Sequence, residues 1–296
     1  MSTVIQSSNF TARLIKHHQV ADNAMAFQFE KPAGWSFKAG QFLELTLLNP
    51  AETDAEGNTR TFSIASAPHE PHLTVAAPMS DTAFNRMLRS MPLDSEVKLA
   101  GPFGDFTLHN NASRTAVFLA DGIGIAPFHS ILLDAAQRML PHRIFLFYSN
   151  RRPEDAPFLE ELQALQQQNP HYKLIATMTE MGQSHRAWKG NIGPIDYQLL
   201  NRELKAAATP DWYVAGPIYY LAGSPQAVHD FQAMLIDNGI DSDDIRTEEF
   251  AATASRIPTA APGRTPRRRG SILALGIERR VNAFRSVLHR AHTRQA

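Results

Sequence analysis

The chain of 296 residues contains no cysteine. This absence excludes disulfides, iron–sulfur clusters and cysteine-ligated zinc within these residues. Twelve histidines are present, but none stands in a metal-binding motif such as H-E-x-x-H. We therefore expect no metal site.

Long apolar runs are missing as well. No run approaches the roughly 20 residues that a helix needs to cross a bilayer, and residues 1–10 lack the charged and apolar regions of a signal peptide. The hydrophobic fraction of 43% is ordinary for a globular protein. We therefore expect a cytoplasmic protein, long enough for two domains with separate cores.

Net charge is also lacking over the whole chain, but the two signs are unevenly distributed. Residues 251–296 hold ten arginines, no lysine and one glutamate, a net charge of +9, which leaves −9 for residues 1–250. An acidic body thus carries a basic tail, and such an asymmetry bears on the choice of partners.

Residues 1–110 have the pattern of a β domain. Short strand-like runs, some alternating apolar and polar residues, are separated by turn residues, and a single helix is predicted over 82–91. The predicted strands are 11–20, 25–30, 42–48, 61–66, 72–77 and 96–100. Many short strands with turn signals are typical of a closed or nearly closed antiparallel barrel.

Residues 111–250 change to an alternation of strands and helices. The predicted strands are 115–120, 143–148, 174–178 and 218–221, and the predicted helices are 128–140, 156–168, 196–204 and 225–238. This alternation favours a doubly wound parallel sheet with helices on both faces. Such sheets bind ligands at the carboxyl ends of their strands.

The rest of the chain is organised around residues 117–128, which combine a buried strand, a turn with Gly122 and Gly124, and the start of a helix. The two glycines allow a tight turn and a close approach of the backbone to a ligand. The helix start offers free N–H groups and a positive dipole end, which attract a phosphate. We expect a pyrophosphate at this turn.

Several motifs, in order along residues 10–250, resemble those of the ferredoxin–NADP reductase superfamily. R-T-F-S-I-A-S at 60–66 is similar to its R-x-Y-S-x-x-S flavin signature, and D-G-I-G-I-A-P at 121–127 is similar to its G-G-x-G-I-x-P nucleotide turn. Further matches lie at 80–84, 101–106, 148–151, 222–225 and 247–250. The resemblance implies a flavin-binding barrel followed by an NAD(P)-binding α/β domain, with FAD and either NADH or NADPH as cofactors.

The resemblance assigns the flavin site to Arg60, Thr61, Phe62, Ser63 and Thr82. The guanidinium of Arg60 suits a phosphate, which it can bind through two donors. The Phe62 ring could stack on the isoalloxazine, and the Ser63 hydroxyl could bond to the N5 edge. Thr82, at the start of its helix, could hold the flavin pyrophosphate. Phe62 stands where the family has tyrosine, so one hydroxyl contact is lost.

The resemblance also assigns a nucleotide site and a catalytic set. The nucleotide residues are Gly122, Gly124, Ile125, Pro127, Asn150, Arg151 and Gly223, and the catalytic residues are Ser63, Glu248 and Phe250. Phe250 would cover the flavin face that the nicotinamide must reach, and one glutamate would sit near the ring. Arg151 and Arg152 could bind the 2′-phosphate of NADPH, but arginines on a solvated loop are equally common, so the choice of nucleotide stays open.

Two departures from the family pattern bear on this site. Asp121 replaces the first glycine of the turn, where it either weakens diphosphate binding or points away and caps the helix. Ala222 stands where many members carry a cysteine, so hydride transfer must rely on positioning.

Two functions are consistent with these residues. The first is an FAD-dependent NAD(P)H oxidoreductase that passes electrons to an external acceptor, either a protein such as ferredoxin, flavodoxin or an oxygenase component, or a small molecule. The second is a flavin- or dinucleotide-binding regulatory subunit that senses redox state without turnover. A nucleic-acid ligand would rest on the basic tail alone, and we do not expect one.

The tail has a pattern of its own. Residues 258–270 are rich in proline, glycine and arginine, which predicts a flexible linker. Beyond it, apolar residues recur on one face of a predicted helix, at Leu273, Ile277, Val281, Phe284 and Leu288. A basic amphipathic helix suits the acidic body, an anionic membrane surface or an acidic electron acceptor. A disordered extension with chance periodicity is equally consistent.

Overall fold

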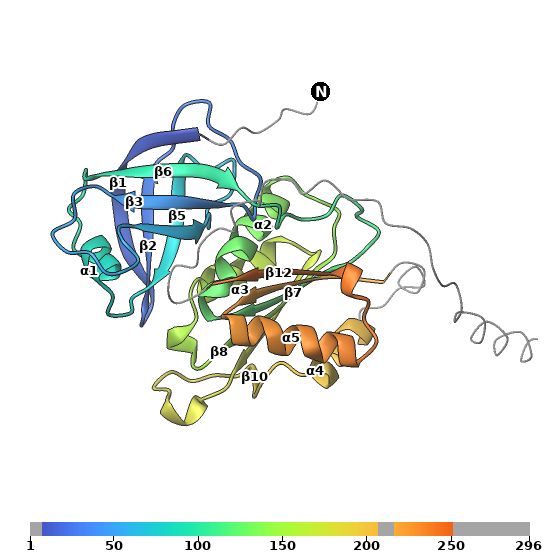
Figure 1. Ribbon diagram of the computed structural model, residues 1–296. Helices are drawn as coiled ribbons and strands as arrows, with labels where there is room; N and C mark the ends of the chain where they lie inside the picture. The colour runs from blue at the N-terminus through green and yellow to red at the C-terminus, as the bar shows by residue number, and fades with distance from the viewer. Residues whose placement is uncertain (1–7, 207–215, 251–296) are drawn as a thin grey trace, which may run out of the picture. The chain divides into compact units, whose positions relative to one another are not determined.

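The computed structural model describes residues 8–206 and 216–250 of the chain (Figure 1). The predicted linker over 258–270 and the predicted helix over 273–288 lie outside the described residues. By its contacts the chain divides after Ser255, so both sheets described below belong to one compact unit. The boundary predicted at residue 110 stays a prediction.

The first sheet is antiparallel, with six strands in the order β4-β3-β6-β1-β2-β5. The strands are β1 (Ser8–Ala21), β2 (Ala24–Glu30), β3 (Phe42–Leu47), β4 (Thr59–Ser63), β5 (His72–Pro78) and β6 (Glu96–Phe103). A bridge between Ile64 and Val75, and a hydrogen bond from Ala65 N to Thr74 O at 2.8 Å, connect the end of β4 to β5. The two edge strands therefore meet, and the sheet curls into the predicted barrel.

Alternating side chains fill the interior of this barrel. In β3, Leu43, Leu45 and Leu47 are buried while the residues between them are partly exposed, which is the predicted period of two. One short helix, α1 (Ala83–Arg89), follows β5, and its buried Phe84 and Leu88 pack into the same core.

The second sheet is parallel, with six strands in the order β10-β9-β8-β7-β11-β12. The strands are β7 (Ala116–Asp121), β8 (Ile144–Asn150), β9 (Tyr172–Met178), β10 (Asn191–Ile192), β11 (Ile218–Gly223) and β12 (Ile245–Glu249). From β7 the chain first winds out to β10 and then returns to β11 on the other side of β7. A doubly wound sheet of this kind has its switch point beside the first strand, here β7.

Helices cover both faces of the parallel sheet. Helices α2 (Ile125–Gln137) and α3 (Leu159–Gln168) pack on one face, and α4 (Tyr197–Ala206) and α5 (Pro225–Asp237) pack on the other (Figure 1). Alternate residues of β7 supply the two cores, since Phe118 faces α2 while Val117 and Leu119 face α4 and α5. The apolar run of β7 is thus explained by burial on both faces.

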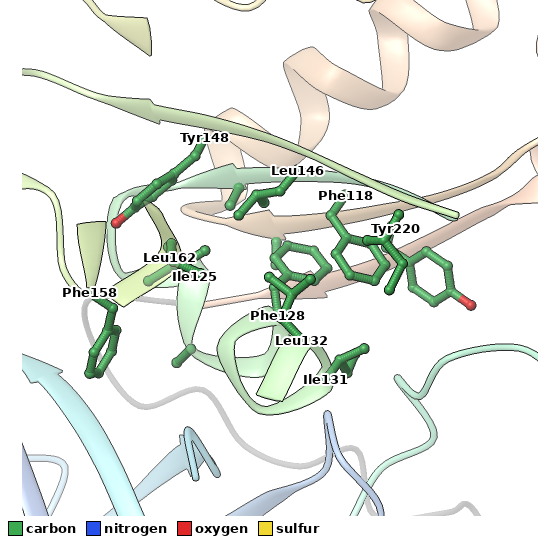
Figure 2. Packing of buried hydrophobic residues seen from close by; sticks show 14 of the residues in the cluster. Phe118, Ile125, Phe128, Ile131, Leu132, Leu146, Tyr148, Phe158, Leu162 and Tyr220 are labelled. Atoms are coloured by element: carbon green, nitrogen blue, oxygen red, sulfur yellow. The ribbon is translucent and has the colours of Figure 1, made fainter. Parts of the chain in front are cut away.

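Aromatic packing fixes α2 against its face of the sheet. The Phe118 and Phe128 rings stack with centroids 4.6 Å apart, and Tyr220 meets Phe118 edge-on at 5.2 Å (Figure 2). Such aromatic pairs contribute about 0.5–1.5 kcal/mol each beyond the area they bury. The helix that follows the predicted phosphate turn is therefore rigidly placed.

The structure corrects three details of the sequence prediction. Helix α2 begins at Ile125 rather than at residue 128, because proline is tolerated in a first helical turn and Pro127 stands there. Strands β10 and β12 are additional edge strands. The sequence of β12, I-R-T-E-E, has no apolar alternation that would have indicated a strand. Among the described residues, no helix is long and apolar enough to cross a membrane.

Candidate functional site

The predicted phosphate turn lies at the carboxyl end of β7, beside the switch point. A 3₁₀ turn, η1 (Gly122–Gly124), joins β7 to α2. Gly122 has φ +52°, and a Cβ added there would meet no atom within 4 Å. Its backbone therefore faces open space in a conformation that favours glycine. This is the geometry expected of a backbone that a ligand approaches closely.

The other glycines of this region have a different physical reason. A Cβ on Gly124 would lie 2.3 Å from the carbonyl oxygen of Ala222, and a Cβ on Gly223 would lie 2.9 Å from Cβ of Asp121. Gly124 and Gly223 therefore allow η1 to pack against the end of β11. We expected Gly124 to allow a close approach to a ligand. The close contact of Gly124 with the backbone of Ala222 already explains why a glycine is needed at this position. Ile125 and Pro127 are buried in the first turn of α2.

Asp121 makes no capping hydrogen bond through its side chain. The capping alternative that the sequence left open is therefore not observed. Burial raises the pKa of this carboxyl. The shift is towards the neutral form of the carboxyl.

Asn150 ends β8, next to the same turn. Asn150 is buried, at 5% exposure, and the Tyr148 hydroxyl lies near its amide, but neither the amide oxygen nor the amide nitrogen makes a hydrogen bond of ordinary geometry among the described residues. A buried amide without a partner costs about 1–3 kcal/mol. A polar ligand at the edge of the sheet would relieve this cost, so the observation supports the predicted nucleotide contact of Asn150.

Arg151 and Arg152, which follow β8, differ in how free their guanidinium groups are to bind a ligand. Arg152 is bound through two nitrogens to Asp155, at 2.7 and 2.9 Å. Arg151 has a side-chain exposure of 57% and lies 3.5 Å from the Asp155 carboxylate. Of the two arginines, Arg151 is thus the better placed to meet a phosphate from solvent.

The predicted flavin strand is β4, and its arginine is engaged within the barrel. Nη2 of Arg60 lies 2.7 Å from Asp54 Oδ1 and 3.2 Å from Glu56 Oε2. Nη1 donates to the carbonyls of Glu56, Gly57 and Thr59, and the guanidinium stacks 5.0 Å from the Phe84 ring. A phosphate ligand would have to compete with these carboxylates. The phosphate role of Arg60 stays a prediction.

The neighbours of Arg60 lie in different environments. Thr61 is exposed. Phe62 belongs to the barrel core, with its ring 6.0 Å from Phe84, which weakens the expected stacking on a flavin. Thr82 caps α1, since its hydroxyl accepts a hydrogen bond from Asn85 N at 3.2 Å.

Ser63 and Glu248, which are 185 positions apart in the sequence, meet through a short hydrogen bond from the serine hydroxyl to Oε1 of the carboxylate. The register of β12 against β11 places Glu248 opposite Ala222. Phe250 then donates its backbone N–H to Gly223 O at 2.9 Å. The structure thus brings together the three residues predicted to be catalytic, at the carboxyl edge of the parallel sheet.

The Glu248 carboxyl has an altered acidity. Burial raises its pKa to about 7, an effect opposed by the Ser63 hydrogen bond and increased by the charge of Asp105. A carboxyl with a pKa near 7 can hold or release a proton at neutral pH. This property distinguishes Glu248 as a candidate proton donor.

Sequence reasoning missed two residues of this region, His129 and Ser130 on α2. His129 Nδ1 lies 2.8 Å from Ala65 O, and Ser130 Oγ donates to Ser66 O at 2.6 Å. These bonds connect α2 to the segment that follows Ser63. The only sequence signal is polar residues on the otherwise apolar first turns of a helix.

The fold and this edge define a class of structure: an antiparallel barrel followed by a doubly wound parallel sheet, with the candidate site at the carboxyl ends of its strands. Residues 118–224 match the family model of the oxidoreductase NAD-binding domain. The chain is 27% identical to ferredoxin–NADP reductase B of Sorangium cellulosum over 222 residues, which cover 72% of this chain and 88% of the relative. It is 25% identical to the glycine betaine monooxygenase reductase subunit of Chromohalobacter salexigens over 234 residues, covering 78% of this chain and 61% of the relative.

A solved structure has the same fold. A ferredoxin–NADP⁺ reductase from Neisseria gonorrhoeae, with bound FAD and NADP, superposes with a TM-score of 0.66 at 22% identity, covering 81% of this chain and 98% of that chain. The family model, the relatives and this structure together support the ferredoxin–NADP reductase-like superfamily for this chain.

Proposed function

We propose that this protein is an FAD-dependent NAD(P)H oxidoreductase that passes electrons to a separate acceptor. The observation that carries the proposal is the hydrogen bond between Ser63 and Glu248, which joins the predicted flavin strand to the edge where the nucleotide would bind. The open backbone at Gly122 and the unpartnered amide of Asn150 support a nucleotide at that edge.

Some residues of this edge would bind the cofactors, and Glu248 would hold or release a proton. When bound, the flavin would take a hydride from the nicotinamide and release its electrons one at a time. Gly122 and Asn150 would hold the nucleotide, and Phe250 would cover the flavin face until the nicotinamide arrives. Glu248 would hold or release a proton beside the flavin strand, because its pKa of about 7 allows both protonation states, and the Ser63 hydroxyl would keep its hydrogen bond to the carboxyl.

The acceptor that we propose is an electron-transfer protein, namely a ferredoxin, a flavodoxin or an oxygenase component. Relatives with named acceptors support this class, among them a reductase component of terephthalate 1,2-dioxygenase from a Comamonas species, 24% identical over 82% of this chain and 68% of the relative. The chain spans 61% of the glycine betaine monooxygenase reductase subunit, so the activity of the whole relative is not transferred with the match. Contacts through the basic tail and a cytoplasmic location stay predictions from the sequence.

An anaerobic titration of the purified yellow protein with NADH and with NADPH tests the proposal. We expect at least one of the two nucleotides to bleach the flavin absorbance within seconds. Reoxidation by ferricyanide should restore the absorbance. Bound flavin that neither nucleotide reduces would favour the regulatory alternative, which the reductases named above do not support.

A further inference from the structure

His129 is a buried histidine held between the barrel and two helices of the parallel sheet. Its Nδ1 lies 2.8 Å from the carbonyl oxygen of Ala65, which follows the predicted flavin strand. Its Nε2 lies 3.1 Å from Oε2 of Glu161 on α3. The Phe158 ring stacks on the imidazole, with centroids 4.2 Å apart, and fixes its plane. Both ring nitrogens therefore have a defined partner.

The chemistry of these partners fixes the role of Nδ1. A carbonyl oxygen only accepts hydrogen bonds, so Nδ1 must carry a proton and donate it to Ala65 O. On the other side of the ring, the hydrogen bond between Glu161 and His129 lowers the pKa of the Glu161 carboxyl.

The surroundings give Glu161 no stronger competing partner among the groups that face it. From β1, His18 faces Glu161, but burial and the nearby Lys16 lower the pKa of His18 and favour its neutral form. Ala65 contributes only a backbone carbonyl, and Phe158 carries no charge. A cavity of about 540 Å³, lined in part by His18, Phe158 and Glu161, opens on this side. Glu161 has a side-chain exposure of 59%, so the pair is accessible to solvent through the carboxylate.

Because His129 lies on α2, its hydrogen bond to Ala65 O links the nucleotide turn to the flavin strand. At its start α2 continues from the turn Gly122–Gly124, where the nucleotide is proposed to bind. One turn further, His129 holds Ala65 O, and Ser130 holds Ser66 O at 2.6 Å. The segment so held follows directly from Ser63. Helix α2 therefore sets the distance between the nucleotide turn and the flavin strand.

We propose that His129, paired with Glu161, is a positioning residue for hydride transfer, and that its bond to Ala65 O fixes the strand carrying Ser63 against the nucleotide turn. The inference rests on the proposed function. Displacement of reacting groups by about 1 Å can cost about 100-fold in rate. Loss of the bond to Ala65 should accordingly slow the transfer step without removing either binding site.

The first test determines whether Nδ1 carries a proton and needs no turnover. In protein labelled with ¹⁵N-histidine, the His129 signals are assigned by their loss in a His129→Asn variant. We expect Nδ1 to carry a proton, because it faces the carbonyl oxygen of Ala65. A ring whose only proton is on Nε2 would overturn the hydrogen bond to Ala65 O.

The second test uses two variants, each of which keeps one of the two hydrogen bonds of His129. In His129→Asn the amide nitrogen lies near the position of Nδ1 and keeps a donor for Ala65 O. In His129→Gln the amide lies near the position of Nε2 and keeps only the contact to Glu161. Stopped-flow measurements on flavin-loaded protein give the limiting rate of flavin reduction, and titration with the oxidised nucleotide gives its Kd.

We expect His129→Gln to lower the limiting rate about 10- to 100-fold with Kd changed less than about twofold, and His129→Asn to restore the rate to within about threefold of the unsubstituted protein. Equal rates in the two variants, or a loss of rate matched by a loss of nucleotide affinity, would overturn the positioning role. If neither nucleotide reduces the unsubstituted protein, the proposed function fails and the positioning role fails with it, while the ¹⁵N result still decides whether Nδ1 donates to Ala65 O.

Discussion

Replacing Glu248 with glutamine should stabilise the folded protein at pH 8 and leave its stability at pH 4 unchanged. Glutamine is nearly the same size and can still accept the hydrogen bond from Ser63, but it cannot ionise. The comparison therefore isolates the cost of the carboxylate charge at this site.

The magnitude follows from the pKa of Glu248. Burial raises this pKa from an ordinary 4.5 to about 7, which at ~1.4 kcal/mol per pH unit corresponds to roughly 3 kcal/mol. Below pH 4.5 the carboxyl is protonated in both the folded and the unfolded state, so the free energy of unfolding is unaffected. Between pH 4.5 and pH 7 the unfolded state loses its proton first, and the stability of the unsubstituted protein falls as the pH rises. Above pH 7 the difference stays constant.

Urea denaturation followed by tryptophan fluorescence at pH 4, 6 and 8 measures this effect. Glu249→Gln, an exposed neighbour on the same strand, is the matched control, and its midpoint should differ from that of the unsubstituted protein equally at each pH. A Glu248→Gln midpoint that exceeds that of the unsubstituted protein by the same amount at pH 4 and pH 8 would refute the reasoning.

Three further predictions concern the cofactor sites. Arg60→Ala should fold but lose most of its FAD, because a phosphate of the cofactor loses its two-donor partner. The ratio of absorbance at 450 and 280 nm measures the flavin content. Full flavin content in the variant would show that Arg60 serves only its contacts to Asp54 and Glu56. Gly122→Ala should retain FAD while its Kd for NAD(P)H rises, because the added methyl group would occupy the open space where the nucleotide is proposed to bind. The variant should also lose about 1 kcal/mol of stability, because φ +52° disfavours a side chain. Gly124→Ala should instead give little folded protein, because its Cβ would lie 2.3 Å from Ala222 O, and similar behaviour of the two variants would contradict this distinction. Arg151→Ala should raise the Kd for NADPH about tenfold and change that for NADH less than twofold if the protein uses the 2′-phosphate; equal changes would assign Arg151 to another contact.

The sequence by itself determined the two-sheet architecture. Burial on both faces demands a continuous apolar strand, and the run at β7 therefore indicated a parallel sheet before any contact was known. The alternation in β3 indicated a barrel strand for the corresponding reason. These patterns are local consequences of where a strand is buried, so they can be read without knowing what packs against it. The resemblance of the motifs added the superfamily, which the comparisons support.

The tertiary structure alone decided how the predicted residues act. Glycine at 122 and at 124 looks alike in sequence, but only the packing of η1 against β11 shows that Gly124 is required by the protein backbone. The polar strand β12 gave no pattern of its own, and its pairing with β11 is what places Glu248 opposite Ala222. The pKa of Glu248 depends on burial and on Ser63, 185 positions away. Charge interactions, burial and hydrogen bonds between distant segments depend on which segments the fold brings together. Local sequence patterns do not contain this information.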